Sequence, residues 1–210
     1  MNEAASPFQG KKLLIFDLDG TLVDSSPIHA RAFAEVFAPL QVAVDYDRIA
    51  GMTTAAAVDR LLLDAGREAA AEERDRLRDA KQQRSRALIE QELREIPGAV
   101  AFVTAARALF RCALCTSASP PSAEAALAAI GLAGIFDPVV TSADVRKGKP
   151  DPEGFLLAAS RAGIEPARAL VFEDSESGLA AARAAGMDAI AIGPGLRDWA
   201  SLLAEMEAGA

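Results

Sequence analysis

The feature that most constrains this chain is a short apolar run that ends in two acidic residues. The run spans Leu13–Phe16, and the segment Asp17-Leu18-Asp19-Gly20-Thr21 follows it. An unbroken apolar run of this length suits a strand buried on both faces of a parallel sheet. Ligands of open α/β sheets bind at the carboxyl ends of the strands, which is where Asp17 and Asp19 fall. Two carboxylates this close repel each other unless a cation or a shared proton intervenes, and Mg²⁺ prefers such oxygen ligands. The alternative is a polar turn at a strand end, because acidic residues are common in turns.

Short apolar segments alternate with helical patterns in the second half of the chain. We expect strands at 112–116, 137–141, 169–172 and 189–192, with helices between them. This alternation predicts a parallel sheet with helices on both faces. Residues 25–95 show helical spacing without a strand pattern, and the charge-rich stretch 67–95 is interpreted as two solvated helices. We therefore predict an α/β core formed by residues 1–24 and 96–210, with an all-helical insert at 25–95.

Three further polar segments follow apolar strands or lie in nearby loops. They are Thr116, Lys149 in the segment Lys147-Gly148-Lys149-Pro150-Asp151-Pro152, and the pair Glu173-Asp174. Taken singly, Thr116 could cap the following helix, and Lys149 could be an ordinary solvated loop lysine. Glu173-Asp174 could be acidic residues that favour a helix start through the helix dipole. Together with Asp17-Leu18-Asp19-Gly20-Thr21, they stand in the order of the four motifs of the haloacid dehalogenase superfamily, which the chain resembles over roughly its whole length.

The resemblance implies a Rossmann-like core, a helical cap inserted after the first strand, and phosphoryl-transfer chemistry. By this resemblance Asp17 is the nucleophile that forms an aspartyl phosphate, and Asp19 is the general acid and base. The founding dehalogenases also use an aspartate nucleophile but have no acid at the position of Asp19. Asp19 therefore favours phosphoryl chemistry.

The resemblance also implies a Mg²⁺ ion and a phosphate site. The metal would be held by Asp17, by the backbone carbonyl of Asp19 and by Asp174, with Glu173 also in the metal site. Phosphate oxygens would be bound by Thr116 and the backbone N–H of Ser117 at a strand-to-helix turn. Lys149 would supply a positive charge that balances the carboxylates and the phosphate.

Segments 171–178 and 181–187 look most like the sugar-phosphatase and β-phosphoglucomutase-like branch of the superfamily. A histidine stands at the position of His29 in that branch, which implies a supporting role in protonation or substrate contact. As the single histidine of the chain, at the end of an apolar stripe, His29 could equally be structural. A phosphonate-cleaving branch needs a cap lysine that forms a Schiff base. The insert has one lysine, Lys81, and it lies in a charge-rich helix, which argues against that branch.

Mutases of this branch carry basic residues in a cap loop that grips the second phosphate of a bisphosphate. The corresponding segment here, 51–57, has no Lys or Arg, and the nearest one after it is Arg60. We therefore predict a phosphatase that acts on a small phosphorylated metabolite, a sugar phosphate in the simplest case, with a β-phosphoglucomutase-like phosphomutase as the alternative. Two other classes of protein fit the sequence less well. A receiver-type signalling domain is ordinarily a single uninterrupted domain, in which the helical insert would have no use. A nucleotide-binding Rossmann module needs a Gly-rich turn after its first strand, and segment 17–21 is not such a turn.

Charge and hydropathy limit the partners of the chain. The formal net charge of -8 argues against nucleic acid, because phosphate-backbone binding needs concentrated Lys and Arg. No apolar run approaches membrane-spanning length, and the N-terminus lacks the basic-then-apolar pattern of a signal peptide. We expect a cytoplasmic enzyme with no nucleic-acid or membrane partner, either a monomer or a weak homodimer.

The two cysteines form a C-x-x-C segment that could indicate a redox or metal pair. Cys112 and Cys115 lie in an expected strand, where residues three apart point to opposite faces and are separated by ~10 Å at about 3.3 Å per residue. A disulfide requires Cα atoms within about 7 Å. We therefore predict two buried free thiols.

Overall fold

The computed structural model describes residues 6–50 and 52–209 and divides into two compact units. The first, called the core unit, comprises Met1–Asp24 and Arg94–Ala210, and the second, called the cap unit, comprises Ser25–Leu93. Residues 1–5 and Gly51, the first residue of segment 51–57, lie outside the described residues. Residues 54–57 of that segment belong to a helix that begins at Thr54, so only its first part is a loop. None of the described helices is both long and apolar enough to cross a membrane.

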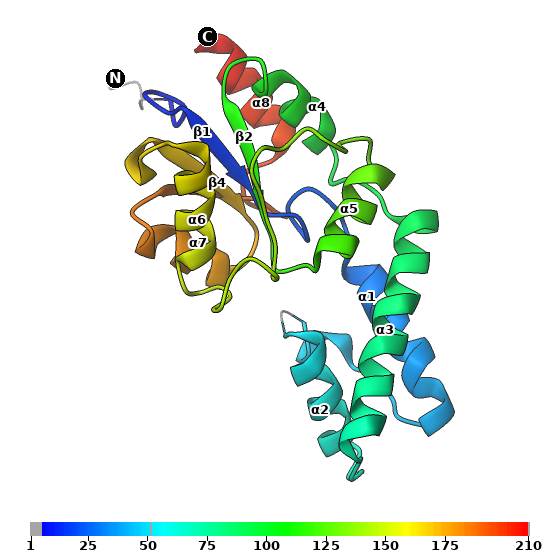
Figure 1. Ribbon diagram of the computed structural model, residues 1–210. Coiled ribbons are helices and arrows are strands. Elements are labelled where there is room, and N and C mark those ends of the chain that lie inside the picture. Colours follow the sequence, from blue (N-terminus) through cyan, green and yellow to red (C-terminus); the bar gives the residue numbers. More distant parts are fainter. Residues whose placement is uncertain (1–5, 51, 210) are drawn as a thin grey trace. The chain divides into compact units, whose positions relative to one another are not determined.

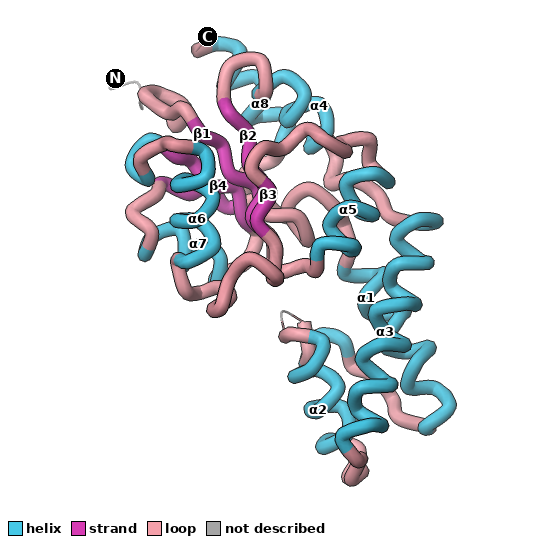
Figure 2. The backbone as a smooth tube through the Cα atoms, viewed as in Figure 1, coloured by secondary structure: helices cyan, strands magenta, loops and turns pink. Residues whose placement is uncertain are grey.

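The core unit is built on a five-stranded parallel sheet (Figures 1 and 2). The strands are β1 (Leu13–Phe16), β2 (Arg111–Cys115), β3 (Val139–Val140), β4 (Ala169–Glu173) and β5 (Asp188–Ala191). Their order in the sheet is β3-β2-β1-β4-β5, so β1 is central and the order reverses direction beside it. Sheets of this kind bind ligands outside the carboxyl ends of the strands at such a reversal. The α/β fold with a helical insert predicted from the sequence is confirmed.

Helices cover both faces of this sheet (Figure 1). Those of the core unit are α4 (Ala99–Ala106), α5 (Pro120–Ala129), α6 (Glu153–Ala162), α7 (Glu176–Ala184) and α8 (Trp199–Ala208). Leu13 and Ile15 of β1 share a buried cluster with residues of α6 and α7. On the opposite face, Phe16 stacks on Phe172 of β4 at 5.0 Å between ring centroids and contacts Trp199 of α8 at 5.9 Å. Alternation of side chains along β1 therefore assigns odd-numbered positions to the α6 and α7 face.

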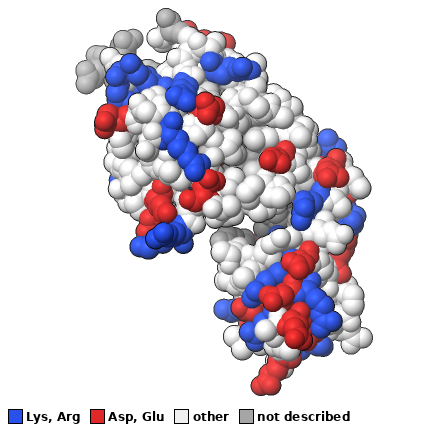
Figure 3. Space-filling model, viewed as in Figure 1, with Lys and Arg blue, Asp and Glu red and all other residues white. Residues whose placement is uncertain are grey.

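The cap unit is helical throughout its regular elements. It contains α1 (Ser26–Phe37), α2 (Thr54–Asp64) and α3 (Ala71–Glu92), with short 3₁₀ segments at Ala38–Leu40 and Tyr46–Arg48. Phe33 and Phe37 of α1 pack against Val58, Leu61 and Leu62 of α2 in a core of their own. Lys and Arg side chains are interspersed with Asp and Glu over the surface of this unit (Figure 3), which suits a solvated helical surface.

Segment 67–95 contains one long helix, α3 (Ala71–Glu92), so the prediction of two helices there was wrong. α3 runs without interruption for 22 residues. No Gly or Pro occurs between Ala71 and Glu92 to end a helix. Charged residues occupy most faces of this helix. The sequence pattern therefore did not show its narrow buried stripe, which consists of Lys81, Ser85, Leu88 and Ile89.

The two cysteines are buried free thiols, which confirms the prediction made for them. Cys115 belongs to the cluster beneath α6 and α7, with Leu13 and Ile15 of β1. Burial raises the pKa of each thiol to about 12, so neither is a nucleophile near neutral pH.

Candidate active site

Two neighbouring strands of the core unit end in acidic residues at the same edge of the sheet. β1 and β4 pair in parallel with Phe16 opposite Phe172. The chain keeps this pairing for one more residue, because the N–H of Asp17 donates to the carbonyl of Phe172 at 3.0 Å. Asp17 therefore lies beside Glu173, and both side chains project on the α6 and α7 side of the sheet. Both residues are buried, with exposures of 5% and 1%.

The ammonium group of Lys149 lies between these two carboxylates. Its Nζ atom is 2.5 Å from Oδ1 of Asp17 and 2.7 Å from Oε2 of Glu173. It also lies 5.2 Å from the ring centroid of Phe155, which is buried in α6. A buried charge is stable only when it is paired, so Lys149 and the two acids require one another.

Asp174 is the third carboxylate of the group. The residue as a whole is exposed, but its carboxyl group is turned towards the loop after β1, where Oδ1 accepts a hydrogen bond from the hydroxyl of Thr21 at 3.1 Å. Gly20 makes this approach possible: it has a φ of +82°, and a Cβ there would collide with the Asp174 carboxylate. The Gly20-Thr21 pair thus holds Asp174 in place, a role that the sequence did not reveal.

This group of acidic residues suits a divalent cation. Asp17, Glu173 and Asp174 each offer a carboxylate oxygen, and these oxygens lie within 4.8 Å of one another. Three carboxylates and one ammonium leave two negative charges (three minus one), which one divalent ion would balance. Mg²⁺ prefers oxygen ligands and keeps coordination positions for water and phosphate oxygens. The residues present therefore fit Mg²⁺.

The electrostatic environment shifts the pKa values of three side chains in this group. Burial raises the pKa of the Asp17 carboxyl; Lys149 opposes this rise, and the charge of Glu173 adds to it. Burial, followed by the charge of Glu173, raises the pKa of Asp174 to about 6. Burial alone would lower the pKa of the Lys149 ammonium, but Asp17 and Glu173 outweigh it, so this pKa is raised and Lys149 stays charged.

Glu173 is held on both of its oxygens. Oε1 accepts hydrogen bonds from the N–H and the hydroxyl of Ser175, at 3.1 and 2.8 Å, while Oε2 accepts from Lys149. The Ser175 hydroxyl also accepts from the N–H of Gly178 and thereby caps α7. A Cβ at Gly178 would collide with the Glu173 carboxylate, so the first turn of α7 is shaped around this side chain. The sequence did not reveal the part played by Ser175.

The remaining core residues predicted for the site lie at or just beyond the same strand ends. Thr116 follows β2 and is buried, and its hydroxyl accepts a hydrogen bond from the N–H of Ala118 at 3.0 Å. Ser117 is exposed in the turn between β2 and α5. Asp19 is half-buried in the tight turn after β1, where the N–H of Gly20 donates to the carbonyl of Val23 at 2.8 Å. The core unit therefore supplies an acidic group, a lysine and a hydroxyl-rich turn.

A family model described as haloacid dehalogenase-like hydrolase matches residues 11–186. The chain belongs to the haloacid dehalogenase-like hydrolases. It is 34% identical over 184 residues to the fructose-1-phosphate phosphatase YqaB of Escherichia coli, covering 84% of this chain and 94% of that protein. It is 28% identical over 191 residues to the β-phosphoglucomutase of Bacillus subtilis, covering 88% and 84%.

A solved relative has the same fold. The crystal structure of CbbY from Rhodobacter sphaeroides in complex with phosphate aligns with a TM-score of 0.78 and 32% identity, covering 90% of this chain and 91% of that chain. These similarities place this hydrolase in the branch that contains sugar phosphatases, β-phosphoglucomutases and CbbY, as the motifs predicted. It is a phosphoric monoester hydrolase.

His29 belongs to the cap unit of the hydrolase rather than to the core unit. Its Nδ1 lies 3.4 Å from Nζ of Lys81 and 3.5 Å from Oγ of Ser85, both on α3. Lys81 is 6% exposed, and its Nζ lies 4.8 Å from the ring centroid of Phe33. The sequence had placed Lys81 in a solvated charge-rich helix, and the structure instead buries it between α1 and α3.

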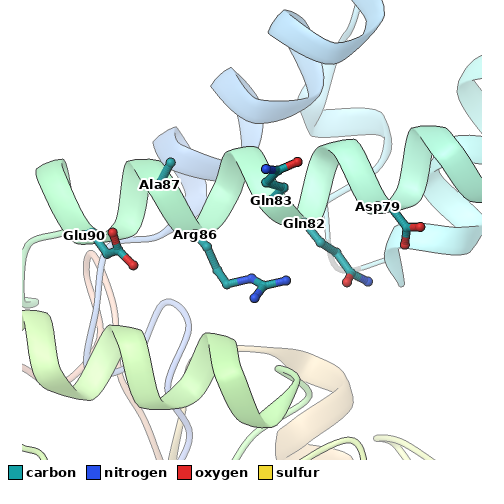
Figure 4. A pocket seen from close by; sticks show the side chains of 6 residues that line it. All are labelled: Asp79, Gln82, Gln83, Arg86, Ala87 and Glu90. Atoms are coloured by element: carbon teal, nitrogen blue, oxygen red, sulfur yellow. The ribbon is translucent and has the colours of Figure 1, made fainter.

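The cap unit also has an open hollow on α3 (Figure 4). It is lined by Asp79, Gln82, Gln83, Arg86, Ala87 and Glu90. The side chains of Gln82 and Arg86 extend from the same side of the helix, so the hollow offers amide and guanidinium groups flanked by two carboxylates.

Proposed function

We propose that this enzyme is a Mg²⁺-dependent phosphatase that hydrolyses a small monophosphorylated sugar through a phosphoryl group carried on Asp17. The observation that carries the proposal is the placement of Asp17 at the end of the central strand, paired with Lys149 and flanked by Glu173 and Asp174. An acidic side chain so placed, with a fixed cation beside it, is suited to receive a phosphoryl group.

The reaction consists of two displacements at phosphorus. In the first, an oxygen of the Asp17 carboxylate attacks, the bond from phosphorus to the sugar oxygen breaks, and the carboxyl of Asp19 gives its proton to that leaving oxygen. In the second, the Asp19 carboxylate takes a proton from water, the water oxygen attacks phosphorus, and inorganic phosphate leaves Asp17 as a carboxylate. Asp17 and Asp19 thereby return to their starting states.

Mg²⁺ and phosphate have separate groups of ligands in this proposal. Asp17, Asp174, Glu173 and Asp19 would hold the ion, Asp19 through its backbone carbonyl. When bound, the ion supplies neutralising charge to the transferring phosphoryl group. Lys149 contributes a fixed positive charge beside Asp17 that water screens little, because its side chain is only 11% exposed.

The hydroxyl-rich turn after β2 would bind the phosphate oxygens. Thr116 offers a hydroxyl, and Ser117 offers its backbone N–H close to the start of α5, where backbone N–H groups favour an anion. The name of the Escherichia coli relative, a fructose-1-phosphate phosphatase, supports a sugar phosphate as the substrate class.

The phosphomutase alternative requires positive charge for a second phosphate. The arginines of the cap unit considered for this role form ion pairs with carboxylates of the same unit. Segment 51–57 has no Lys or Arg. Arg48 and Arg60 pair with Asp64 at 3.4 and 2.9 Å, and Arg31 pairs with Glu92 at 2.7 Å. A distal phosphate buried without a cationic partner is unfavourable, so these pairings favour hydrolysis over transfer back to a sugar.

The proposal is tested by a screen of several dozen phosphorylated metabolites, each with Mg²⁺ and with a chelator. We expect phosphate release from one or more sugar monophosphates, no release in the chelator, and recovery on adding Mg²⁺. Full activity in the chelator would contradict the metal site.

A second assay separates the phosphatase from the mutase. β-Glucose 1-phosphate is supplied with a trace of the bisphosphate, and both glucose 6-phosphate and free phosphate are followed. Glucose 6-phosphate appearing much faster than phosphate would establish the mutase instead.

A further inference from the structure

The loop that carries Lys149 is fastened to α6 by one side chain. Both carboxylate oxygens of Glu153, the first residue of α6, accept backbone hydrogen bonds from this loop. The N–H of Arg146 donates to Oε1 at 3.1 Å and the N–H of Lys147 donates to Oε2 at 3.0 Å. The carboxylate thus bridges two successive peptide groups that lie just before Lys149.

The two residues after Glu153 lie close to Lys149 or to the end of β2. Phe155 places its ring 5.2 Å from Nζ of Lys149. A Cβ at Gly154 would lie 2.9 Å from Sγ of Cys115, so the backbone of α6 lies close against the end of β2 at this point. The first turn of α6 is therefore fixed to the sheet on one side and to the Lys149 loop on another.

We propose that Glu153 is a positioning residue for catalysis, which acts by fixing the loop that directs Lys149 at Asp17. The proposal rests on the role given above to Lys149. Glu153 does not belong to the sequence motifs, and it does not follow a strand. An acidic residue in the first turn of a helix is common, so the sequence alone does not single it out.

The physical reason is that Arg146 and Lys147, the part of the loop that Glu153 holds, have few other restraints among the described residues. Arg146 and Lys147 are exposed, and within the described part of the chain the side chain of Lys147 forms an exposed ion pair with Asp151 at 3.5 Å. Charge-assisted hydrogen bonds to a carboxylate are stronger than neutral ones, and a carboxylate can accept both N–H groups at once. A glutamine at this position could accept one of them through its amide oxygen, and an alanine could accept neither.

A purely structural role would have a different signature. If Glu153 served only the helix dipole of α6, its loss would lower stability without changing turnover per folded molecule. If it positions Lys149, kcat and kcat/KM should fall together, because the interaction of Lys149 with the transferring phosphoryl group is lost in the transition state.

The test compares Glu153→Gln, Glu153→Ala and the control Glu165→Gln. Glu165 is an exposed acid shortly after α6 whose side chain has no hydrogen bond or ion pair among the described residues. Turnover of para-nitrophenyl phosphate with Mg²⁺ is measured well below the unfolding temperature and normalised to folded protein. Because displacement of a catalytic group by about 1 Å can cost ~10²-fold, we expect a loss in kcat of about 10²-fold for alanine and about 10-fold for glutamine. Glu165→Gln should match the parent.

A double-mutant cycle with Lys149→Ala then tests the route of action. If Glu153 acts through Lys149, Glu153→Ala should cost almost nothing further in the Lys149→Ala background. Where that background turns over too slowly, the same cycle is measured on the dissociation constant of orthovanadate.

Three results are distinguishable. Glu153→Ala with parental kcat, or with its full loss retained in the Lys149→Ala background, would overturn the positioning role. A fully active Lys149→Ala variant would overturn the function proposed for Lys149 itself.

Discussion

Replacing Lys149 by methionine should destabilise the metal-free core unit by about 3–5 kcal/mol, the cost of leaving buried charge without its partner. Methionine keeps most of the aliphatic volume and the contact with Phe155, so the change isolates the charge. The side chains of Lys149, Asp17 and Glu173 are 11%, 7% and 1% exposed. Because solvent screens them so little, the small energies typical of surface ion pairs do not apply here.

The neighbouring Lys147 provides a matched control. Its side chain is 74% exposed and its ion pair with Asp151 spans 3.5 Å, so Lys147→Met should cost at most about 1 kcal/mol. Both variants remove one lysine from the same loop, and they differ in whether the removed charge is buried.

Urea unfolding followed by tryptophan fluorescence is the assay. Trp199 is the single tryptophan of the chain and is fully buried in the core unit, so its signal reports this unit. The loss for Lys149→Met should shrink when Mg²⁺ is added, because the ion offsets part of the unpaired negative charge. A loss below about 1 kcal/mol in the metal-free protein would refute the claim that Lys149 neutralises buried carboxylates.

Three further outcomes are expected at the acidic group. Asp17→Asn should lower turnover by several orders of magnitude and abolish the acid-trapped phosphoenzyme, and a phosphoenzyme of normal yield would exclude Asp17 as the nucleophile. Gly20→Ala should weaken Mg²⁺ binding measured by calorimetry, because a Cβ there collides with Asp174 and the backbone is in the left-handed region, whereas unchanged affinity would remove Asp174 from the ligands. The pKa of Asp174 is raised to about 6, so protons should compete with Mg²⁺ and its affinity should fall as the pH decreases from about 7 to about 5. An affinity that is constant over this range would contradict that ligand assignment.

Much of the fold could be predicted because its strands are short apolar runs with polar ends. Leu13–Phe16 is buried at every position, as an unbroken apolar run in a parallel sheet should be. The polar residues that follow such strands were identifiable for the same reason, since their position at strand ends restricts where they can lie. Asp17 and Glu173 lie side by side because parallel register brings the ends of β1 and β4 together.

Other features depend on tertiary contacts that have no local pattern. The continuity of α3 and the burial of Lys81 follow from packing against α1 and Phe33, which the charge-rich sequence conceals. Glu153 looks like any acid at a helix start, and its two hydrogen bonds exist only because the Lys149 loop folds back over α6. Helix periodicity and charge counts carry no information about such loop contacts.

In the proposed reaction the phosphoryl group passes through the side chain of Asp17. The most direct test is to quench the enzyme during turnover of its best sugar phosphate with Mg²⁺, reduce it with borohydride and locate modified residues by mass spectrometry. Borohydride reduces an aspartyl phosphate to homoserine. We expect homoserine at position 17, and none when substrate is omitted. Homoserine at a different aspartate, or sustained turnover with no modified residue at position 17, would contradict it.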